Sequence, residues 1–299
     1  MEAMLYRQLY QLMFSVAHPP RRPRELYCDR WIALMYFWSV LHDRPAEWAS
    51  VEQNWPDDGK ALRGRPLASQ SRLSRRLRTL GVSQLIERLI SAVSERFGIP
   101  LVKLIDSKPL TVGAYSKDAD AKRGRLAEGV FGRGYRLHVV SHGRAPRRFV
   151  LLPLNEHDTV GAAILLPRLE GGGGYAIGDN AYDTNECYRD AAATGHQLLA
   201  PPRECNKGVR DTRYNGPERL RGLDLIDSPM EAACGQPSAF GAALYGFRQR
   251  IESAFGGLTL EGLGALPAWV RGARRVALWA AVKVLQYLWR LAQKEGLMA

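Results

Sequence analysis

Three acidic residues stand out because each lies in a different kind of segment. Asp106 follows the apolar run 101–105, Asp179 follows a second short apolar run that begins at Tyr175, and Glu252 lies in a segment with helical periodicity. Carboxylates at the ends of two strands and on a later helix can meet at one point, although they are far apart in sequence. Carboxylate oxygens are the ligands that hard divalent cations such as Mg²⁺ prefer. The three residues are therefore candidate metal ligands.

The composition of the chain favours a polyanionic partner. The 299 residues carry a formal net charge of +12, and each Lys or Arg that neutralises a phosphate releases counterions. With 46% hydrophobic and 24% charged residues, the chain can bury a sizeable core. Three convergent carboxylates in a basic protein indicate metal-dependent cutting and joining of DNA. Charge alone is equally compatible with a soluble basic protein that has no nucleic-acid role.

Each carboxylate taken alone has a simpler explanation. An Asp after a strand commonly starts a turn, and Asp179 with Asp183 could serve only to cap the next helix. Arg248 and Glu252 could form an ordinary i, i+4 ion pair on a solvated helix. The joint pattern favours the functional interpretation, because the spacing from Asp106 to Asp179 (179 − 106) and from Asp179 to Glu252 (252 − 179) is 73 in both cases.

The helix that carries Glu252 places it beside two other polar side chains. At 100° per residue, Tyr245, Arg248 and Glu252 share one narrow face. Roughly a quarter turn away lies an apolar stripe, formed by Leu244, Phe247, Ile251 and Leu258. We therefore expect Glu252 to project from the edge of a helix packed on a sheet, and Arg248 to bind a DNA phosphate with its planar guanidinium.

The first part of the chain, residues 1–98, is predicted to be an all-helical DNA-binding region. Within it, residues 64–80 resemble a helix-turn-helix unit, because arginines crowd this segment without any acidic residue. We expect Arg72, Arg75 and Arg76 to contact DNA. The alternative is a solvated basic helix that enters no groove.

From residue 99 to residue 299 the periodicity predicts an α/β catalytic domain with C-terminal helices. Its expected mixed sheet, of ribonuclease-H type and flanked by helices, has strands at 101–105, 134–141, 148–153, 175–178 and 197–200. Helices are expected at 160–169, 184–194, 241–255 and 269–294, and residues 203–240 read as loop-rich.

These segments resemble those of bacterial insertion-sequence transposases with a DDE catalytic triad. The resemblance covers about residues 101–292. Its last two motifs are specific only when taken together. The matching segments are Ile105–Ser107, Gly134–His138, Asn155–Asp158, Gly178–Asp183, and the Tyr-x₂-Arg-x₃-Glu start of a Tyr-x₂-Arg-x₃-Glu-x₆-Lys signature at Tyr245, Arg248 and Glu252.

The resemblance implies a DNA transposase that works by two-metal phosphoryl transfer at insertion-sequence ends. Asp106, Asp179 and Glu252 would hold two Mg²⁺ or Mn²⁺ ions, while Tyr182, Tyr245 and Arg248 would contact DNA. The implied partners are terminal inverted repeats, target DNA and a second copy of the chain, as a homodimer on paired ends.

One position departs from the signature and leaves two alternatives open. The signature lysine, which the family associates with DNA contact, is replaced by Thr259, and Gly256 and Gly257 precede it. A catalytically decayed or domesticated DNA-binding relative therefore remains an alternative. A nuclease of the same fold, which hydrolyses but does not join strands, is another.

The remaining reactive residue types suggest no second site. The four cysteines have neither zinc nor disulfide spacing, and we expect structural or surface roles for His138, His142 and His157. Asp158 is a rival third carboxylate, although its position favours an N-cap, and the role of Asp183 stays undecided between a turn and the metal. The longest apolar stretch near the start, 31–41, is too short to cross a bilayer. We therefore expect a cytoplasmic, nucleoid-associated protein without a membrane partner.

Overall fold

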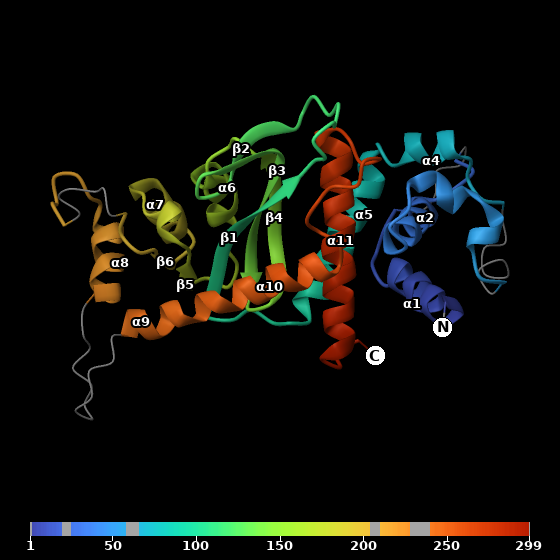
Figure 1. Cartoon of the computed structure of the whole chain (residues 1–299). Coiled ribbons are helices and arrows are strands. Elements are labelled where there is room, and N and C mark those ends of the chain that lie inside the picture. Colours follow the sequence, from blue (N-terminus) through green and yellow to red (C-terminus); the bar gives the residue numbers. More distant parts are fainter. Residues whose placement is uncertain (1, 20–24, 58–65, 204–209, 228–239, 299) are drawn as a thin grey trace. The chain divides into compact units, whose positions relative to one another are not determined.

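The computed structural model describes residues 2–19, 25–57, 66–203, 210–227 and 240–298. The chain divides into two compact units (Figure 1). The helical unit comprises residues 1–96, 261–263 and 268–299, and the sheet unit comprises residues 97–260 and 264–267. No helix in the described ranges is long and apolar enough to cross a membrane.

The helical unit contains the predicted N-terminal helices and also the last helix of the chain. Its helices are α1 (Glu2–Phe14), α2 (Asp29–Leu41), α4 (Gln70–Arg76), α5 (Leu80–Glu95) and α11 (Ala273–Lys294), with short 3₁₀ turns η1 (Ala46–Ser50) and η2 (Glu52–Asn54). Helix α2 is buried from Trp31 to Val40, which agrees with its apolar sequence. The expected helix-turn-helix at 64–80 begins in residues outside the described ranges; its described part contains α4, and α5 begins at its last residue.

Helix α11 packs with α5 and α2 and belongs to the helical unit, while the catalytic domain predicted for residues 99–299 stays a prediction. Helix α11 is buried on nearly all sides through its second half. Trp289, for example, meets Phe37 of α2 edge to face at 6.2 Å between ring centroids. A helix that is apolar nearly all round is typical of a core position.

The sheet unit is a six-stranded mixed sheet flanked by helices. The strands are β1 (Val102–Thr111), β2 (Lys122–Ala127), β3 (Val130–His142), β4 (Ala145–Pro153), β5 (Gly174–Ile177) and β6 (His196–Leu199), in the order β2-β3-β1-β5-β6, with β4 also paired to β3. The helices are α6 (Asp158–Leu165), α7 (Asn185–Ala192), α8 (Pro217–Asp227), α9 (Phe240–Tyr245) and α10 (Gln249–Leu260), with 3₁₀ turns η3 (Leu166–Arg168), η4 (Asn180–Tyr182) and η5 (Gly246–Arg248).

Two elements of this unit were not expected. Strand β2 is basic and contains a glycine, so it lacks the β-branched residues that signal a strand; its pairing with β3 forms it. Helix α8 lies in the segment predicted to be loop-rich. Its Arg219 is held by a buried ion pair that the local sequence does not reveal.

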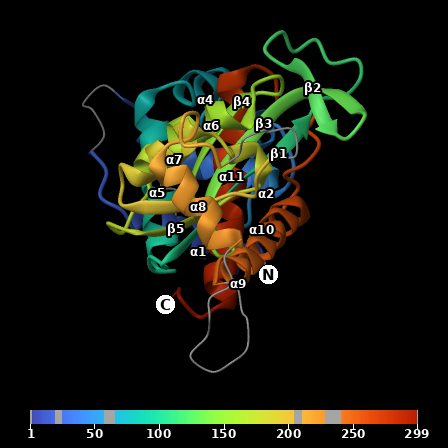
Figure 2. The same ribbon diagram turned by 90° about the vertical axis from the view of Figure 1, so that its left-hand side faces the viewer.

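Alternation along β1 directs neighbouring side chains to opposite faces of the sheet. Ile105 belongs to the core under α6 and α7, whereas Leu104 packs with Ile251 of α10. Figure 2 shows α6 and α7 on one side of the strands and α10 on the other. Because side chains alternate with period two, Asp106 lies on the α10 face and Ser107 on the α6 face.

Candidate active site

Two of the three predicted carboxylates lie side by side at the centre of the sheet. Strands β1 and β5 are parallel, with Leu104 opposite Ile177. Asp106 follows Leu104 by two residues, and Asp179 follows Ile177 by two residues. The structure corrects one detail: Asp106 lies within β1 and not at its end. Antiparallel pairing with β3 continues as far as Thr111.

The third carboxylate is linked to the first by an arginine. Arg248 Nη2 lies 3.4 Å from Asp106 Oδ2, and Arg248 Nη1 lies 3.2 Å from Glu252 Oε1. The i, i+4 pair expected on the helix is therefore present, and it extends to the sheet. Glu252 itself is exposed, with 61% of its side chain accessible, whereas Asp106 is only 14% accessible.

Burial dominates the electrostatics of the two aspartates. It raises the pKa of Asp106 to about 6, even though the Ser107 amide and the Arg248 guanidinium favour the charged form, and neighbouring Asp179 and Asp158 raise it further. Burial likewise raises the pKa of Asp179. Two carboxylates that are costly to ionise next to one another gain most from a nearby cation.

Asp158 is neither the helix cap nor a free ligand. His157 is the N-cap of α6, where its Nδ1 accepts from the Thr159 amide at 3.3 Å, so the predicted cap assignment for Asp158 was wrong. Asp158 Oδ1 accepts from Ser107 Oγ at 2.6 Å, and its Oδ2 accepts from Arg136 Nη1 at 3.0 Å. Its oxygens therefore hold β1 and β3 together from the α6 face.

The two acidic residues of the Gly178–Asp183 motif have separate tasks. Asp179 caps η4, because its Oδ1 accepts from the Ala181 amide at 2.9 Å. Asp183 is fully buried in a two-bond ion pair with Arg219, at 2.7 Å and 2.6 Å. Asp183 therefore anchors α8 and is not available to a metal.

The two predicted tyrosines differ in exposure. Tyr182 is 1% exposed and lies in the core with Ile105 and Cys187, so in this conformation it cannot contact DNA. Tyr245 is partly buried against Leu104 and Ile177. It lies close enough to the carboxylates that Asp179, Asp106 and Glu252 add to the effect of burial in raising its pKa.

The carboxylate oxygens are of the chemical type that binds a divalent cation, although they do not converge into a complete coordination site. Within the described ranges, no group of three or more His, Cys, Asp or Glu residues converges closely enough to hold a metal ion. Asp106 and Asp179 supply adjacent oxygens, and the Arg248 guanidinium supplies positive charge between Asp106 and Glu252. A site in which a side-chain cation sits between two carboxylates suits a metal cation chemically.

One cation beside the site was missed by the sequence analysis. Lys108 follows Asp106 on the same face of β1, and its Nζ lies 6.0 Å from the ring centroid of Phe255 on α10. Burial lowers the pKa of Lys108. Thr259, at the position of the signature lysine, donates to the Phe255 carbonyl at 2.7 Å and stays on its own helix. The sequence did contain a signal for Lys108: in a strand, a residue two positions after Asp106 lies on the same face of the sheet.

The arginines of α4 are not equivalent. Arg72 and Arg75 are exposed, and Arg72 lies over the Tyr27 ring at 5.7 Å. Arg76 is turned inward, where it donates to Asp29 Oδ1 at 2.6 Å and to the Tyr27 carbonyl at 2.8 Å. Arg76 therefore ties α4 to the start of α2.

Comparison with known proteins decides the family. The sequence pattern of the transposase DDE domain matches residues 98–288. The chain belongs to this family. The transposase is therefore a metal-dependent enzyme that cleaves and joins DNA, and the family uses divalent metal ions. A comparison of the transposase with curated proteins finds no match.

A solved structure with a similar fold is that of piggyBac transposase in a synaptic complex with hairpin DNA. The match has a TM-score of 0.50 and 8% sequence identity, and covers 99% of this chain and 76% of that one. At this identity the likeness concerns the fold alone. It confirms the prediction of a ribonuclease-H-like mixed sheet flanked by helices, with further helices at the N-terminus of the transposase.

Proposed function

We propose that Asp106, Asp179 and Glu252 carry the transposase reaction by holding two divalent ions, Mg²⁺ or Mn²⁺. The observation that carries this proposal is the parallel register of β1 and β5, which sets Asp106 beside Asp179. The link from Asp106 through Arg248 to Glu252 adds the third carboxylate. Divalent ions held by these three carboxylates would supply Lewis-acid chemistry for the in-line displacement at phosphorus, with water or a 3′ hydroxyl as nucleophile.

In this proposal Arg248 and Tyr245 position the DNA strand beside the three carboxylates. Arg248 exchanges its carboxylate partners for a DNA phosphate, to which its planar guanidinium can donate two hydrogen bonds. Tyr245 packs beside it at the edge of the site. Because Asp106 and Asp179 are buried, water is excluded from the sheet side of the three carboxylates. The exposed Glu252 lies on the opposite side, on α10.

Lys108 takes the part of the missing signature lysine. Glu252, Phe255 and Thr259 are spaced i, i+3 and i+7, so they share one face of α10. The ammonium of Lys108 lies over the middle member of this face. A positive charge therefore faces α10 at Phe255, three residues after Glu252, without a lysine on the helix. We expect Lys108→Met to weaken binding of cleaved DNA ends, and Lys117→Met, which removes an equal charge from the loop after β1, to leave it unchanged.

Exposed arginines in the helical unit support its contact with DNA. Arg72 and Arg75 are the exposed arginines of α4 that we assign to DNA contact, and Arg76 is left with a structural task. The DNA would be the terminal inverted repeats of an insertion sequence and the target duplex. A homodimer on paired ends would bring two such sites together, and the piggyBac transposase structure with a similar fold is itself that of a synaptic complex.

The test is cleavage of DNA that carries the inverted repeats flanking the gene. We expect Mg²⁺- or Mn²⁺-dependent nicking by the native protein and none by Asp106→Asn, Asp179→Asn or Glu252→Gln, with DNA binding retained. Glu186→Gln, which removes an equal charge from an exposed helix position, is the matched control and should cleave normally. Full cleavage by any one of the three variants would overturn its assignment.

Thr259, at the position of the signature lysine, is the reason to test whether the protein binds DNA without catalysis. The fold is the reason to test whether it is a nuclease that does not join strands. Precleaved ends separate these outcomes. Joining of a precleaved end to a target duplex identifies a transposase, and cleavage without joining identifies a nuclease. Specific binding without either reaction, in any divalent metal, identifies a decayed protein.

A further inference from the structure

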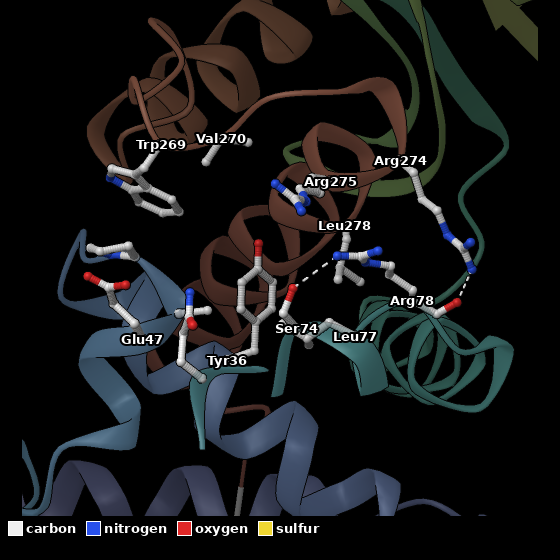
Figure 3. Close-up of a pocket in the computed structure, with 13 residues that line it drawn as sticks. Tyr36, Glu47, Ser74, Leu77, Arg78, Trp269, Val270, Arg274, Arg275 and Leu278 are labelled. Carbon is white, nitrogen blue, oxygen red and sulfur yellow. Dashed lines mark hydrogen bonds between the residues drawn. The ribbon is translucent and has the colours of Figure 1, made fainter. Parts of the chain in front are cut away.

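A cavity of about 250 Å³ lies within the helical unit. All of its lining residues belong to this unit, and they come from α2, η1, α4, α11 and the segment just before α11 (Figure 3). The wall combines aromatic and aliphatic side chains with several arginines. A cavity that is mostly apolar but carries a few directed polar groups is typical of a ligand site.

The floor of the cavity is a tyrosine whose polar atom is unused. Tyr36 is 5% exposed, and Figure 3 shows its hydroxyl directed into the cavity, toward Arg275. Among the residues that the structure describes, this hydroxyl has no hydrogen-bond partner. Burial raises the pKa of Tyr36 while the nearby Arg275 guanidinium lowers it. A ligand in the cavity can therefore hydrogen-bond to this hydroxyl directly.

The two ends of the cavity have opposite charge. Trp269 and the exposed carboxylate of Glu47 lie at one end, and Arg275 and Arg78 lie at the other (Figure 3). The Arg78 guanidinium is held by Ser74 Oγ at 3.3 Å. Within the described part of the chain, the guanidinium of Arg275 and the carboxylate of Glu47 have no ion-pair partner.

We propose that this cavity binds a single nucleotide, with its base against Trp269 and its phosphate at Arg275 and Arg78. An indole face stacks on any base, and a guanidinium binds phosphate. The Glu47 carboxylate can accept a hydrogen bond from an amino or imino group of a base. The Tyr36 hydroxyl can donate to the phosphate or the sugar. A purely apolar ligand would use neither the Tyr36 hydroxyl nor the Arg275 guanidinium.

Two sources could supply such a nucleotide, and they can be told apart. One is a nucleotide that leaves the base stack of the bound DNA, which costs least where the base is unpaired. The other is a free nucleoside monophosphate. Because α4, which forms part of the wall, also carries the exposed Arg72 and Arg75, we expect the DNA to be the source.

The experiment measures binding by the full-length Asp106→Asn protein without divalent metal, so its outcome does not depend on the catalytic assignment. Fluorescence anisotropy compares a paired duplex with the same duplex carrying one unpaired nucleotide. We expect the unpaired duplex to bind more tightly, and Trp269→Ala and Arg275→Met each to reduce this preference by about tenfold. Arg44→Met, an exposed arginine of the same unit that does not line the cavity, should leave the preference unchanged.

A second variant and a second ligand cover the remaining outcomes. Tyr36→Phe removes only the hydroxyl and should lower the preference severalfold without loss of thermal stability, which tests the site even if Trp269→Ala unfolds. Titration with the four deoxynucleoside monophosphates finds the source: binding that depends on Trp269, with no effect on the duplexes, assigns the cavity to free nucleotides. If none of these ligands responds to Trp269, Arg275 or Tyr36, the cavity is not a nucleotide site.

Discussion

Replacing Asp106 by Asn should stabilise the metal-free protein while it abolishes catalysis. Burial raises the pKa of the folded-state carboxyl from 3.8 to about 6, so ionising it costs more in the folded than in the unfolded chain. One pKa unit corresponds to about 1.4 kcal/mol, and a shift of about two units therefore makes the charged form cost roughly 3 kcal/mol at neutral pH. Asn has the shape of the protonated acid and avoids this cost.

The sign of the pH dependence follows from the same shift. Between the unfolded-state and folded-state pKa values, the folded protein binds more protons than the unfolded chain, so stability falls as pH rises through this window. Below pH 3.8 the cost disappears, and above about pH 6 it is complete. The stability difference between Asp106→Asn and the native protein should therefore grow from pH 4 to pH 6 and then stay level.

The assay is thermal unfolding in the presence of EDTA, followed by circular dichroism from pH 4 to pH 8. At pH 7.5 we expect the variant to melt higher by roughly 6 °C, at about 2 °C or more per kcal/mol for a domain of this size. Glu186→Gln, with a side chain that is 70% exposed, removes the same charge and should not change the melting temperature. Added Mg²⁺ should stabilise the native protein more than Asp106→Asn, because only the native site binds it well. An Asn variant that is no more stable than the native protein at pH 7.5 would refute the reasoning.

Three further changes test the rest of the site. Asp183→Asn leaves the buried Arg219 without its charge partner and should cost about 3–5 kcal/mol in urea denaturation; an unchanged midpoint would contradict the anchoring role. Gly161→Ala would put a methyl group 2.3 Å from the His138 ring and should cost about 1–3 kcal/mol, whereas Gly172→Ala, with open space but a positive φ, should cost less. Arg248→Met removes the cation between two carboxylates and should tighten Mn²⁺ binding severalfold without DNA, as followed by electron paramagnetic resonance; weaker Mn²⁺ binding would show that Arg248 does not compete with the metal.

The sequence was sufficient for the catalytic strands because their signal is local. The apolar runs before Asp106 and Asp179 are short, buried and followed by polar residues, and parallel neighbours align such ends at one edge of a sheet. The extension of β1 past Asp106 was not predictable in the same way. This extension is hydrogen-bonded to β3, which lies about 30 residues further along the chain. The sequence of β1 does not indicate the register of that pairing.

Roles that depend on a distant partner were also beyond the sequence. Asp183 and Asp158 read alike, as acidic residues in turns before helices. Only the structure separates them, by giving Asp183 to Arg219 on α8 and Asp158 to Ser107 and Arg136. The packing of α11 against α5 and α2 also depends on distant partners. Its apolar pattern predicted burial, but the pattern does not say which core accepts the helix.

The position of Thr259 shows why a spacing motif can fail while the chemistry remains. A signature such as Glu-x₆-Lys specifies residues that lie on one face of a helix. The physical requirement behind its lysine is a positive charge near that face. A strand that packs against the helix can meet the requirement from across the interface. We propose that Lys108, whose Nζ lies 6.0 Å from the ring centroid of Phe255, does this. A departure from a helical signature is therefore evidence of lost activity only after the strands facing that helix have been searched for the same charge.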